Sequence, residues 1–249
     1  MTMATTIDPD EIEKFSAIAA EWWDPLGKFK PLHKFNPARL GHIRDELCQH
    51  FDRDRFAGKP LEGLKLIDIG CGGGLVSEPM ARLGAAVTGI DAGENNVKTA
   101  LAHALEQDLE IDYRHTTVEE LTESESASFD VVLNLEVVEH VADTGLFLSA
   151  SAELLKPGGI MITATINRTM KALLTAKIGA EYILRWLPAG THDPRKFVRP
   201  TEIRDVLEAA GLQVRTPVGM NYQPLLDAWR ISDDASVNYM ITSVKPPRS

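Results

Sequence analysis

The sequence predicts an α/β protein with a doubly wound, mostly parallel sheet, and three observations lead to this fold class. Short apolar runs alternate with amphipathic helical segments through the middle of the chain, which is typical of strands joined by crossover helices. A glycine-rich turn follows the first of these runs, at residues 70–74. The last apolar runs lack a clear helix between them, which predicts an antiparallel hairpin that closes the sheet with an antiparallel C-terminal strand.

Composition and charge exclude several classes of protein. The 249 residues suit one domain, residues 1–249, and 44% hydrophobic with 25% charged residues is ordinary for globular chains and excludes intrinsic disorder. No apolar run reaches the roughly 18 residues of a membrane span. The net charge of −10 argues against a nucleic-acid partner, because binding phosphates needs a surplus of basic residues. Two cysteines without metal-type spacing, and an N-terminus without a targeting pattern, favour a cytoplasmic protein.

Residues 1–60 are expected to form an N-terminal helical extension. Asp8 is suited to cap the first helix, a proline follows it, and apolar residues then recur at helical spacing as far as Trp22. The tract Pro25–Pro37 contains three prolines and a glycine and is expected to be a loop. A second helix is expected from about Ala38 to His50.

The cofactor-binding core is expected at residues 61–165, followed by an insertion at 166–200 and a C-terminal helix and hairpin at 201–249. These boundaries follow the alternation of strand and helix patterns. The expected strands are Leu64–Ile69, Ala86–Asp91, Ile111–Arg114, Phe129–Leu135 and Ile160–Thr165 in the core, with Leu212–Val218 and Val237–Val244 in the hairpin; the expected core helices are Leu75–Leu83, Glu94–Glu106 and Thr144–Leu155.

The glycine turn is the sharpest motif in the chain. Leu66–Gly74 runs from a strand through Gly70 and Gly72 into a helix, so that the backbone can approach a ligand closely and the helix can offer free N–H groups. A dinucleotide-binding GxGxxG motif requires a third glycine where this sequence has Leu75, which argues against a nicotinamide dehydrogenase. The alternative is a turn whose glycines serve only helix–strand packing.

Acidic residues indicate which ligand the turn binds. Asp91 ends the next strand, where a carboxylate can accept hydrogen bonds from both hydroxyls of a ribose. Asp68, within the first strand, suits a ligand with a positive group. S-adenosylmethionine, which carries an ammonium and a sulfonium, fits these positions better than a pyrophosphate does. Val118, after the third strand, is expected at the rim of the adenine site.

A turn rich in acids follows the fourth strand. Glu136, Glu139 and His140 share one side of this turn if it is helical, at the carboxyl edge of the sheet where open α/β folds bind ligands. Glu139 or His140 could act as a general base toward a hydroxyl nucleophile, and all three could instead hold a divalent cation. Two carboxylates favour Mg²⁺, whereas a histidine suits Zn²⁺ or Mn²⁺. The alternative is an ordinary first turn of a helix, with its acids near the positive end of the dipole.

The glycine motif with Asp91 resembles the Rossmann-like, seven-stranded methyltransferases that use S-adenosylmethionine. Motifs in the flanking regions narrow the resemblance to the bacterial ubiquinone-biosynthesis O-methyltransferases, and they cover nearly the whole chain. These motifs are Trp22–Asp24, Phe29–His33, Asn36–Leu40, Glu139–His140, Gly179–Arg185, Gly190–Asp193 and Val237–Met240.

This resemblance implies methylation of ring hydroxyls on 2-polyprenyl-6-hydroxyphenol and 3-demethylubiquinol by direct in-line transfer. It also implies that Arg39 and Leu135 contact the cofactor together with Gly70 and Asp91, and that the acidic turn binds Mg²⁺. Leu135 replaces a methionine of familiar members, and both side chains are apolar. Gln223 stands where asparagine is usual. A soluble small-molecule acceptor, or a non-catalytic lipid-binding role, is the alternative to a polyprenyl substrate.

Residues 168–196 are expected to contact a membrane surface, to form a lid over the acceptor, or both. The segment has six basic and two acidic residues within an acidic chain, together with many apolar side chains. A polyprenyl substrate resides in a membrane, so the protein is expected to lie peripherally on its inner face, with an assembly of ubiquinone-biosynthesis enzymes as a further partner. His33 and His192 are secondary candidates for the base.

Overall fold

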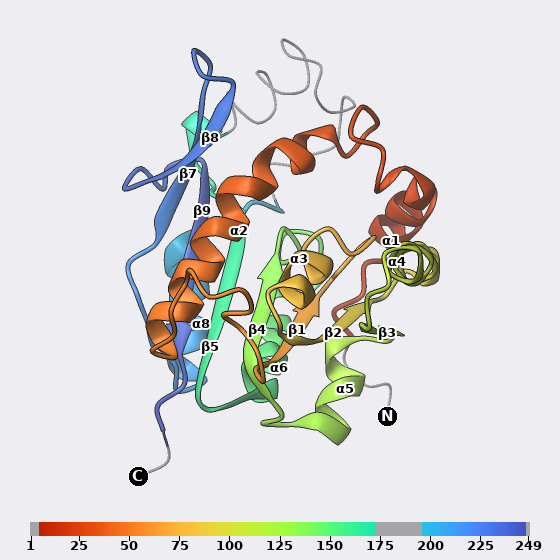
Figure 1. The fold of residues 1–249 in the computed structure, drawn as a ribbon. Coiled ribbons are helices and arrows are strands. Elements are labelled where there is room, and N and C mark those ends of the chain that lie inside the picture. Colours follow the sequence, from red (N-terminus) through yellow and green to blue (C-terminus); the bar gives the residue numbers. More distant parts are fainter. Residues whose placement is uncertain (1–4, 173–195, 248–249) are drawn as a thin grey trace.

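A computed structural model describes residues 5–172 and 196–247, and it has one twisted sheet with helices packed on both faces (Figure 1). The helices are α1 (Pro9–Ser16), η1 (Ala19–Glu21), α2 (Lys30–His50), α3 (Ser77–Arg82), α4 (Glu94–Glu106), α5 (Val118–Glu125), α6 (Thr144–Leu154), α7 (Met170–Ala172) and α8 (Pro200–Ala209). The strands are β1 (Lys65–Ile69), β2 (Ala86–Asp91), β3 (Asp112–His115), β4 (Phe129–Leu135), β5 (Leu155–Ile166), β6 (Gln213–Val214), β7 (Val218–Gln223), β8 (Ala228–Ser232) and β9 (Asn238–Val244).

The order of strands confirms the predicted fold class. Neighbouring strands run β3-β2-β1-β4-β5-β9-β7-β8, with β6 paired to β9. The five core strands pair in parallel, and β9 pairs antiparallel to β5. The predicted strands correspond to β1–β5, to β6, which is shorter than expected, and to β9, whereas β7 and β8 are additional within the described residues. The order reverses between β1 and β4, which is where doubly wound sheets bind ligands.

The hydrophobic core lies in two layers because successive strand residues point to opposite faces. Leu66 packs in the layer with Ile43 of α2, whereas its neighbour Ile67 packs in the layer with Leu148 of α6. The parallel strands β1, β2, β4 and β5 are buried on both faces, as expected where helices cover both sides of a sheet, whereas the edge strand β3 is partly exposed. This packing fixes the carboxyl ends of β1, β2 and β4 side by side.

The N-terminal extension differs from its prediction in two ways. The first helix ends at Ser16 and is followed by the separate turn η1, although Asp8 does cap it by accepting a hydrogen bond from the N–H of Asp10. The expected loop Pro25–Pro37 is wrong in its second half, because α2 starts at Lys30 and contains Pro37. A proline inside a helix removes a hydrogen bond, but the burial of Phe35 and other α2 residues against the sheet outweighs that cost.

The C-terminal region holds the expected antiparallel pair and, in addition, a hairpin that the sequence pattern does not predict. The expected strands near Leu212 and Val237 are present as β6 and β9, and they pair antiparallel. Residues 215–237 between them contain a second antiparallel pair, β7 and β8, and β7 joins the sheet beside β9. No helix in the described part of the chain is long and apolar enough to cross a membrane.

Candidate active site

A pocket opens at the carboxyl edge of the sheet, where β1, β2 and β4 end. The space between its walls, including the open mouth, is about 820 Å³. Gly70, Gly72, Asp91 and Val118 line it, and so do Glu136 and His140 of the acidic turn. The fold therefore brings four predicted cofactor-binding residues and two residues of the predicted catalytic turn to one cavity.

Asp91 holds the glycine turn against the end of β2. Its Oδ2 accepts the N–H of Gly72 at 3.0 Å, and its Oδ1 accepts the N–H of Gly93 at 2.7 Å and the side-chain amide of Asn96 at 3.1 Å. Burial raises the pKa of Asp91, although these donors oppose the shift. A carboxylate has about four acceptor positions, and these three donors leave one for a ligand. Recognition of a ribose requires such an acceptor at the pocket.

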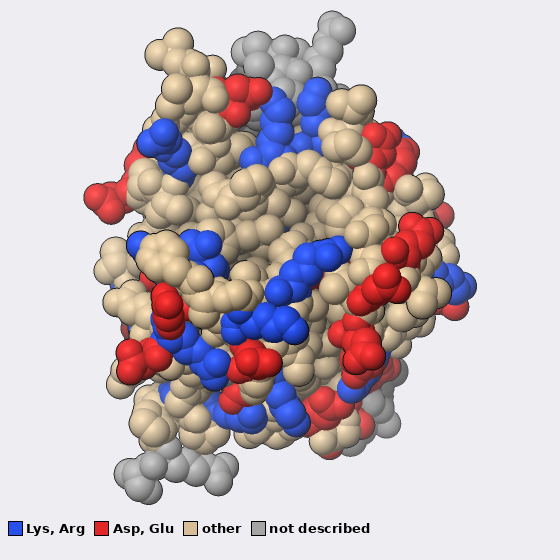
Figure 2. Space-filling model, viewed as in Figure 1, with Lys and Arg blue, Asp and Glu red and all other residues tan. Residues whose placement is uncertain are grey.

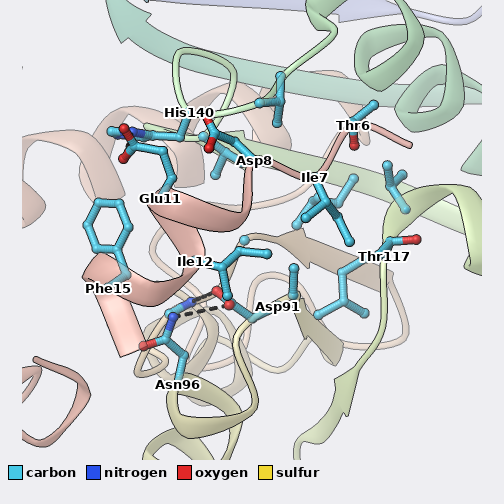
Figure 3. A pocket seen from close by; sticks show the side chains of 18 of the residues that line it. Thr6, Ile7, Asp8, Glu11, Ile12, Phe15, Asp91, Asn96, Thr117 and His140 are labelled. Atoms are coloured by element: carbon cyan, nitrogen blue, oxygen red, sulfur yellow. Dashed lines mark hydrogen bonds and ion pairs between the residues drawn. The ribbon is translucent and has the colours of Figure 1, made fainter. Parts of the chain in front are cut away.

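The N-terminal segment forms one wall of the pocket, which the sequence analysis did not predict. Figure 3 shows α1 crossing the cavity, with Ile12 beside Asp91 and Glu11 turned toward His140. Trp22 also lines the pocket, and its indole N–H donates to Asn96 Oδ1 at 2.9 Å. Only the amphipathic spacing of this segment signalled that it docks on the domain. Its docking place depends on contacts with residues 50 to 74 positions away, such as Gly73 and Asn96.

The glycine turn is shaped to receive Trp22, which leads to a stability prediction. Gly72 has φ +53°, and a Cβ built there would lie 2.4 Å from the Trp22 ring. Gly72→Ala is therefore expected to lower the free energy of unfolding by about 2–4 kcal/mol, from the left-handed backbone and from overpacking. Gly41→Ala in α2, where a Cβ meets nothing within 4 Å, is the control and is expected to be neutral or stabilising. Thermal and urea unfolding would measure both, and equal stability of the two variants would contradict the prediction.

Behind the pocket lies a cluster of buried charges that includes two more predicted cofactor residues. Arg39 is buried beside Glu136, with 3.8 Å between Nη1 and Oε1, and its Nε and Nη1 have no hydrogen-bond partner among the described residues. Asp68 is also buried and accepts a hydrogen bond from Ser77 at 2.6 Å. Burial raises the pKa of Asp68 to about 6, while the nearby Arg39 opposes the shift. This cluster offers a cation and an anion to a ligand that carries both charges.

Glu136 and Glu139 of the acidic turn occupy different environments. Glu136 has φ +58° at the end of β4, and burial, with the adjacent Glu139 carboxylate, raises its pKa. Glu139 is buried below the turn, where its Oε2 accepts the hydroxyl of Thr165 at 2.8 Å. Glu136 lines the pocket, and Glu139 is absent from its lining. A non-glycine residue in the left-handed region is uncommon and is typical of functional sites.

His140 is the titratable side chain of the turn that faces both the pocket and α1. Its Nδ1 lies 3.0 Å from Glu11 Oε2, and the Phe15 ring packs edge-on against it with 5.1 Å between centroids. Because a carboxylate only accepts, Nδ1 carries the proton and the lone pair of the neutral ring is on Nε2. The hydrogen bond from His140, and then that from Lys196, lowers the pKa of Glu11 to about 2.

The three expected metal ligands do not form one ligand set in the structure. His140 contacts Glu11, Glu139 contacts Thr165, and Glu136 faces Arg39. Within residues 5–172 and 196–247, no three acidic, histidine or cysteine side chains gather in an arrangement that could hold a metal ion. These contacts do not fit a three-ligand metal site.

Two other predicted positions lie away from the pocket. Leu135 is buried in the core at the end of β4 rather than in the pocket lining. The ring Nε2 of His33 lies 2.9 Å from the backbone oxygen of Trp22, which gives it a structural contact in the N-terminal segment. His192 lies outside the described residues.

Solved structures share the fold. The magnesium protoporphyrin IX methyltransferase of Synechocystis PCC 6803, with bound SAH, superposes with a TM-score of 0.61 at 21% identity, over 95% of this chain and 93% of that one. A possible histamine N-methyltransferase from Thermotoga maritima superposes with a TM-score of 0.63 at 16% identity, over 95% of this chain and 99% of that one.

Sequence comparisons are more specific. Residues 40–216 match the family model for a methyltransferase domain. The ubiquinone biosynthesis O-methyltransferase of Maricaulis maris is 59% identical over 97% of this chain and 94% of that protein. The protein of the same name from Brucella anthropi is 57% identical over 98% of both chains. At this identity over nearly the full length, the chain belongs to the family of ubiquinone biosynthesis O-methyltransferases.

Proposed function

We propose that this protein methylates ring hydroxyls of 2-polyprenyl-6-hydroxyphenol and 3-demethylubiquinol with S-adenosylmethionine. The observation that carries the proposal is that Asp91, the last residue of β2, and His140, in the turn after β4, line one pocket beside the glycine turn. The former suits a ribose and the latter suits the removal of a proton from a phenol.

The residues present fit the two ends of this cofactor. Asp91 and Val118 suit the ribose and the adenine rim. The unpartnered Nε and Nη1 of Arg39 suit the carboxylate of the amino-acid end, and Asp68 suits its ammonium. When bound, the cofactor supplies a methyl group on a positively charged sulfur, which is open to in-line attack by an oxygen.

His140 is the proposed general base. A phenol titrates near pH ~10, so a base is needed to generate its more nucleophilic anion at neutral pH. Nε2 of His140 accepts the phenolic proton as the new carbon–oxygen bond forms and the carbon–sulfur bond breaks. Glu11 holds Nδ1 protonated and stabilises the imidazolium that results. Glu139, the other predicted base, is assigned a supporting role next to Glu136, because it is buried against Thr165.

A polyprenyl acceptor must be collected from a membrane, and residues 168–196 are proposed to contribute to that contact. Of their six basic residues, the structure describes Arg168, Lys171 and Lys196, and each pairs with a carboxylate of the same chain. Residues 173–195, with the other three, lie outside the described residues. An assembly of biosynthetic enzymes is the further proposed partner.

The proposal is tested by incubating the purified protein with S-adenosylmethionine and a demethylubiquinol carrying a decyl tail in detergent. Mass spectrometry should find a methylated ring product and an equal amount of S-adenosylhomocysteine. The same ring without the free hydroxyl is the control and should give neither product.

Two outcomes would support the alternatives. Equal kcat/KM for a tailless catechol would favour a soluble acceptor, because each methylene buried from water contributes about 0.8 kcal/mol that a polyprenyl site should use. Binding of S-adenosylhomocysteine with no turnover of any phenol would favour a non-catalytic lipid-binding role.

A further inference from the structure

The turn between β7 and β8 has an unusual composition for a hairpin. Its residues are Pro224, Leu225, Leu226 and Asp227, and the N–H of Leu226 closes the turn on the backbone oxygen of Gln223 at 3.1 Å. Proline and aspartate are common turn residues, whereas glycine, asparagine or serine is usual between them. Leu225 is 100% exposed and Leu226 is 59% exposed. No need of the turn itself explains two exposed leucines.

The register places this tip at the functional edge of the sheet. β5 and β7 are both antiparallel to β9, so β7 runs parallel to β5 and ends at the same edge as the strands that form the pocket. The last pair with β9 is Met220 with Asn238, and Asn238 also pairs with Ile166 at the end of β5. Residues 221–223 therefore extend beyond the last residue of β7 that pairs with β9, by roughly 10 Å at the usual rise per residue. Figure 1 shows the hairpin projecting beyond the other strands.

The β7–β8 hairpin packs against α2, although the leucines at its tip are exposed. Trp229 of β8 packs edge-on against Phe35 of α2, with 4.9 Å between ring centroids. Lys34 of α2 binds Asp227 at 2.7 Å, and the Tyr222 hydroxyl donates to the same carboxylate at 2.6 Å. These contacts fix the hairpin against α2, so that the two leucines are presented on a rigid support.

The charges around the tip favour an anionic partner. The hydrogen bond from Lys34 of α2, with the charge of Lys30 nearby, lowers the pKa of Asp227, and Arg230 is exposed three positions beyond the turn. Two cations thus act on one carboxylate and a third is exposed on the same hairpin, in a chain whose net charge is −10. In Figure 2 basic side chains, with some acidic ones, lie near the end of the molecule from which the hairpin projects in Figure 1. Exposed apolar side chains with basic neighbours are typical of surfaces that insert into an anionic lipid interface.

We propose that the β7–β8 tip, with Leu225 and Leu226, inserts into the headgroup region of an anionic membrane. This contact is separate from the proposed one at residues 168–196. A projection of roughly 10 Å matches the depth of interfacial insertion. The contact places the pocket edge toward the lipid, where the acceptor of the proposed function resides, so the biological purpose of the contact rests on that function.

Sedimentation of the full-length protein with vesicles tests the proposal. The vesicles contain phosphatidylglycerol and phosphatidylcholine, or phosphatidylcholine alone as the neutral comparison. The double variant Leu225→Ser/Leu226→Ser is expected to bind the anionic vesicles about tenfold more weakly than the wild type. Leu105→Ser is the matched control, because Leu105 is 79% exposed on α4, and it is expected to bind as the wild type does. Arg230→Gln should weaken binding to the anionic vesicles and leave binding to the neutral ones unchanged.

Three outcomes would overturn the proposal. The first is unchanged vesicle binding by the double leucine variant, and the second is no vesicle binding by the wild type at low salt. The third is self-association of the wild type without lipid that the double variant abolishes, since the tip would then contact a second copy. Turnover of a short-tailed acceptor in detergent should be equal in all variants. If the wild type does not methylate the short-tailed acceptor, the proposed function is contradicted, whereas the vesicle experiment still decides whether the tip binds lipid.

Discussion

Asp91→Ala is expected to abolish cofactor binding at micromolar concentrations. The carboxylate fixes the glycine turn through Gly72 and is positioned for a ribose diol. Hydrogen bonds to charged groups contribute about 1.5–3 kcal/mol each, so losing two of them should weaken affinity by about 100-fold or more. Calorimetric titration with S-adenosylhomocysteine measures this change. An affinity equal to that of the wild type would remove Asp91 from the site.

Two comparison variants separate the causes of that loss. Asp91→Asn keeps the size of the side chain and one acceptor oxygen, so an intermediate affinity is expected if charge and geometry both matter. Glu94→Ala removes a carboxylate at the start of α4 that is exposed and pairs with Lys98. It should bind the cofactor as the wild type does. Circular dichroism of all three variants should show that the fold is retained.

His140→Asn is expected to give the second large effect, on turnover rather than on cofactor binding. Removing a general base typically lowers the rate by about 10²- to 10⁴-fold. The cofactor affinity should change little, because His140 lies across the pocket from Asp91 and contacts α1 (Figure 3). Steady-state kinetics with the decyl acceptor, together with calorimetry, tests both halves. A kcat within a few-fold of the wild type would assign the proton to another group.

The chain offers a matched control for this histidine. His103 of α4 also places its Nδ1 on a carboxylate, 2.6 Å from Glu78 Oε1, but it stacks on Trp23 and is absent from the pocket lining. His103→Asn should cost stability and retain kcat. Glu139→Gln should slow turnover less than His140→Asn does, because Glu139 is buried against Thr165. A larger loss of kcat in Glu139→Gln than in His140→Asn would make Glu139 the general base and His140 the supporting residue.

Local patterns in the sequence were sufficient for most of the sheet. The strands ending at Ile69, Asp91 and Leu135 were placed at the observed last residue, because a buried parallel strand is a continuous apolar run with a turn at its end. Parallel strands end at one edge, so the neighbourhood of the glycine turn, Asp91 and the acidic turn followed from the fold class alone. The family resemblance depended on the same local motifs.

Weak local patterns failed where packing decides the structure. Prolines favoured a loop at Pro25–Pro37, but the burial of Phe35 and its neighbours on the sheet stabilises a helix there. The β7–β8 hairpin lacks strict alternation, and its strands form because β9 offers an edge and α2 offers an aromatic contact to Trp229.

Local patterns in the sequence are enough to predict the parallel strands of the sheet, its cofactor edge and the residue types that serve this edge. Only the tertiary structure decided which of these residues share a pocket: it brought Glu11 to His140, 129 positions away, and Trp22 to Asn96, and it buried Glu139 behind the turn. These two kinds of signal act over different separations along the chain. Strand and turn signals act between neighbours in the chain, whereas the tautomer of His140 and the wall of the pocket depend on contacts between segments that only the folded core brings together.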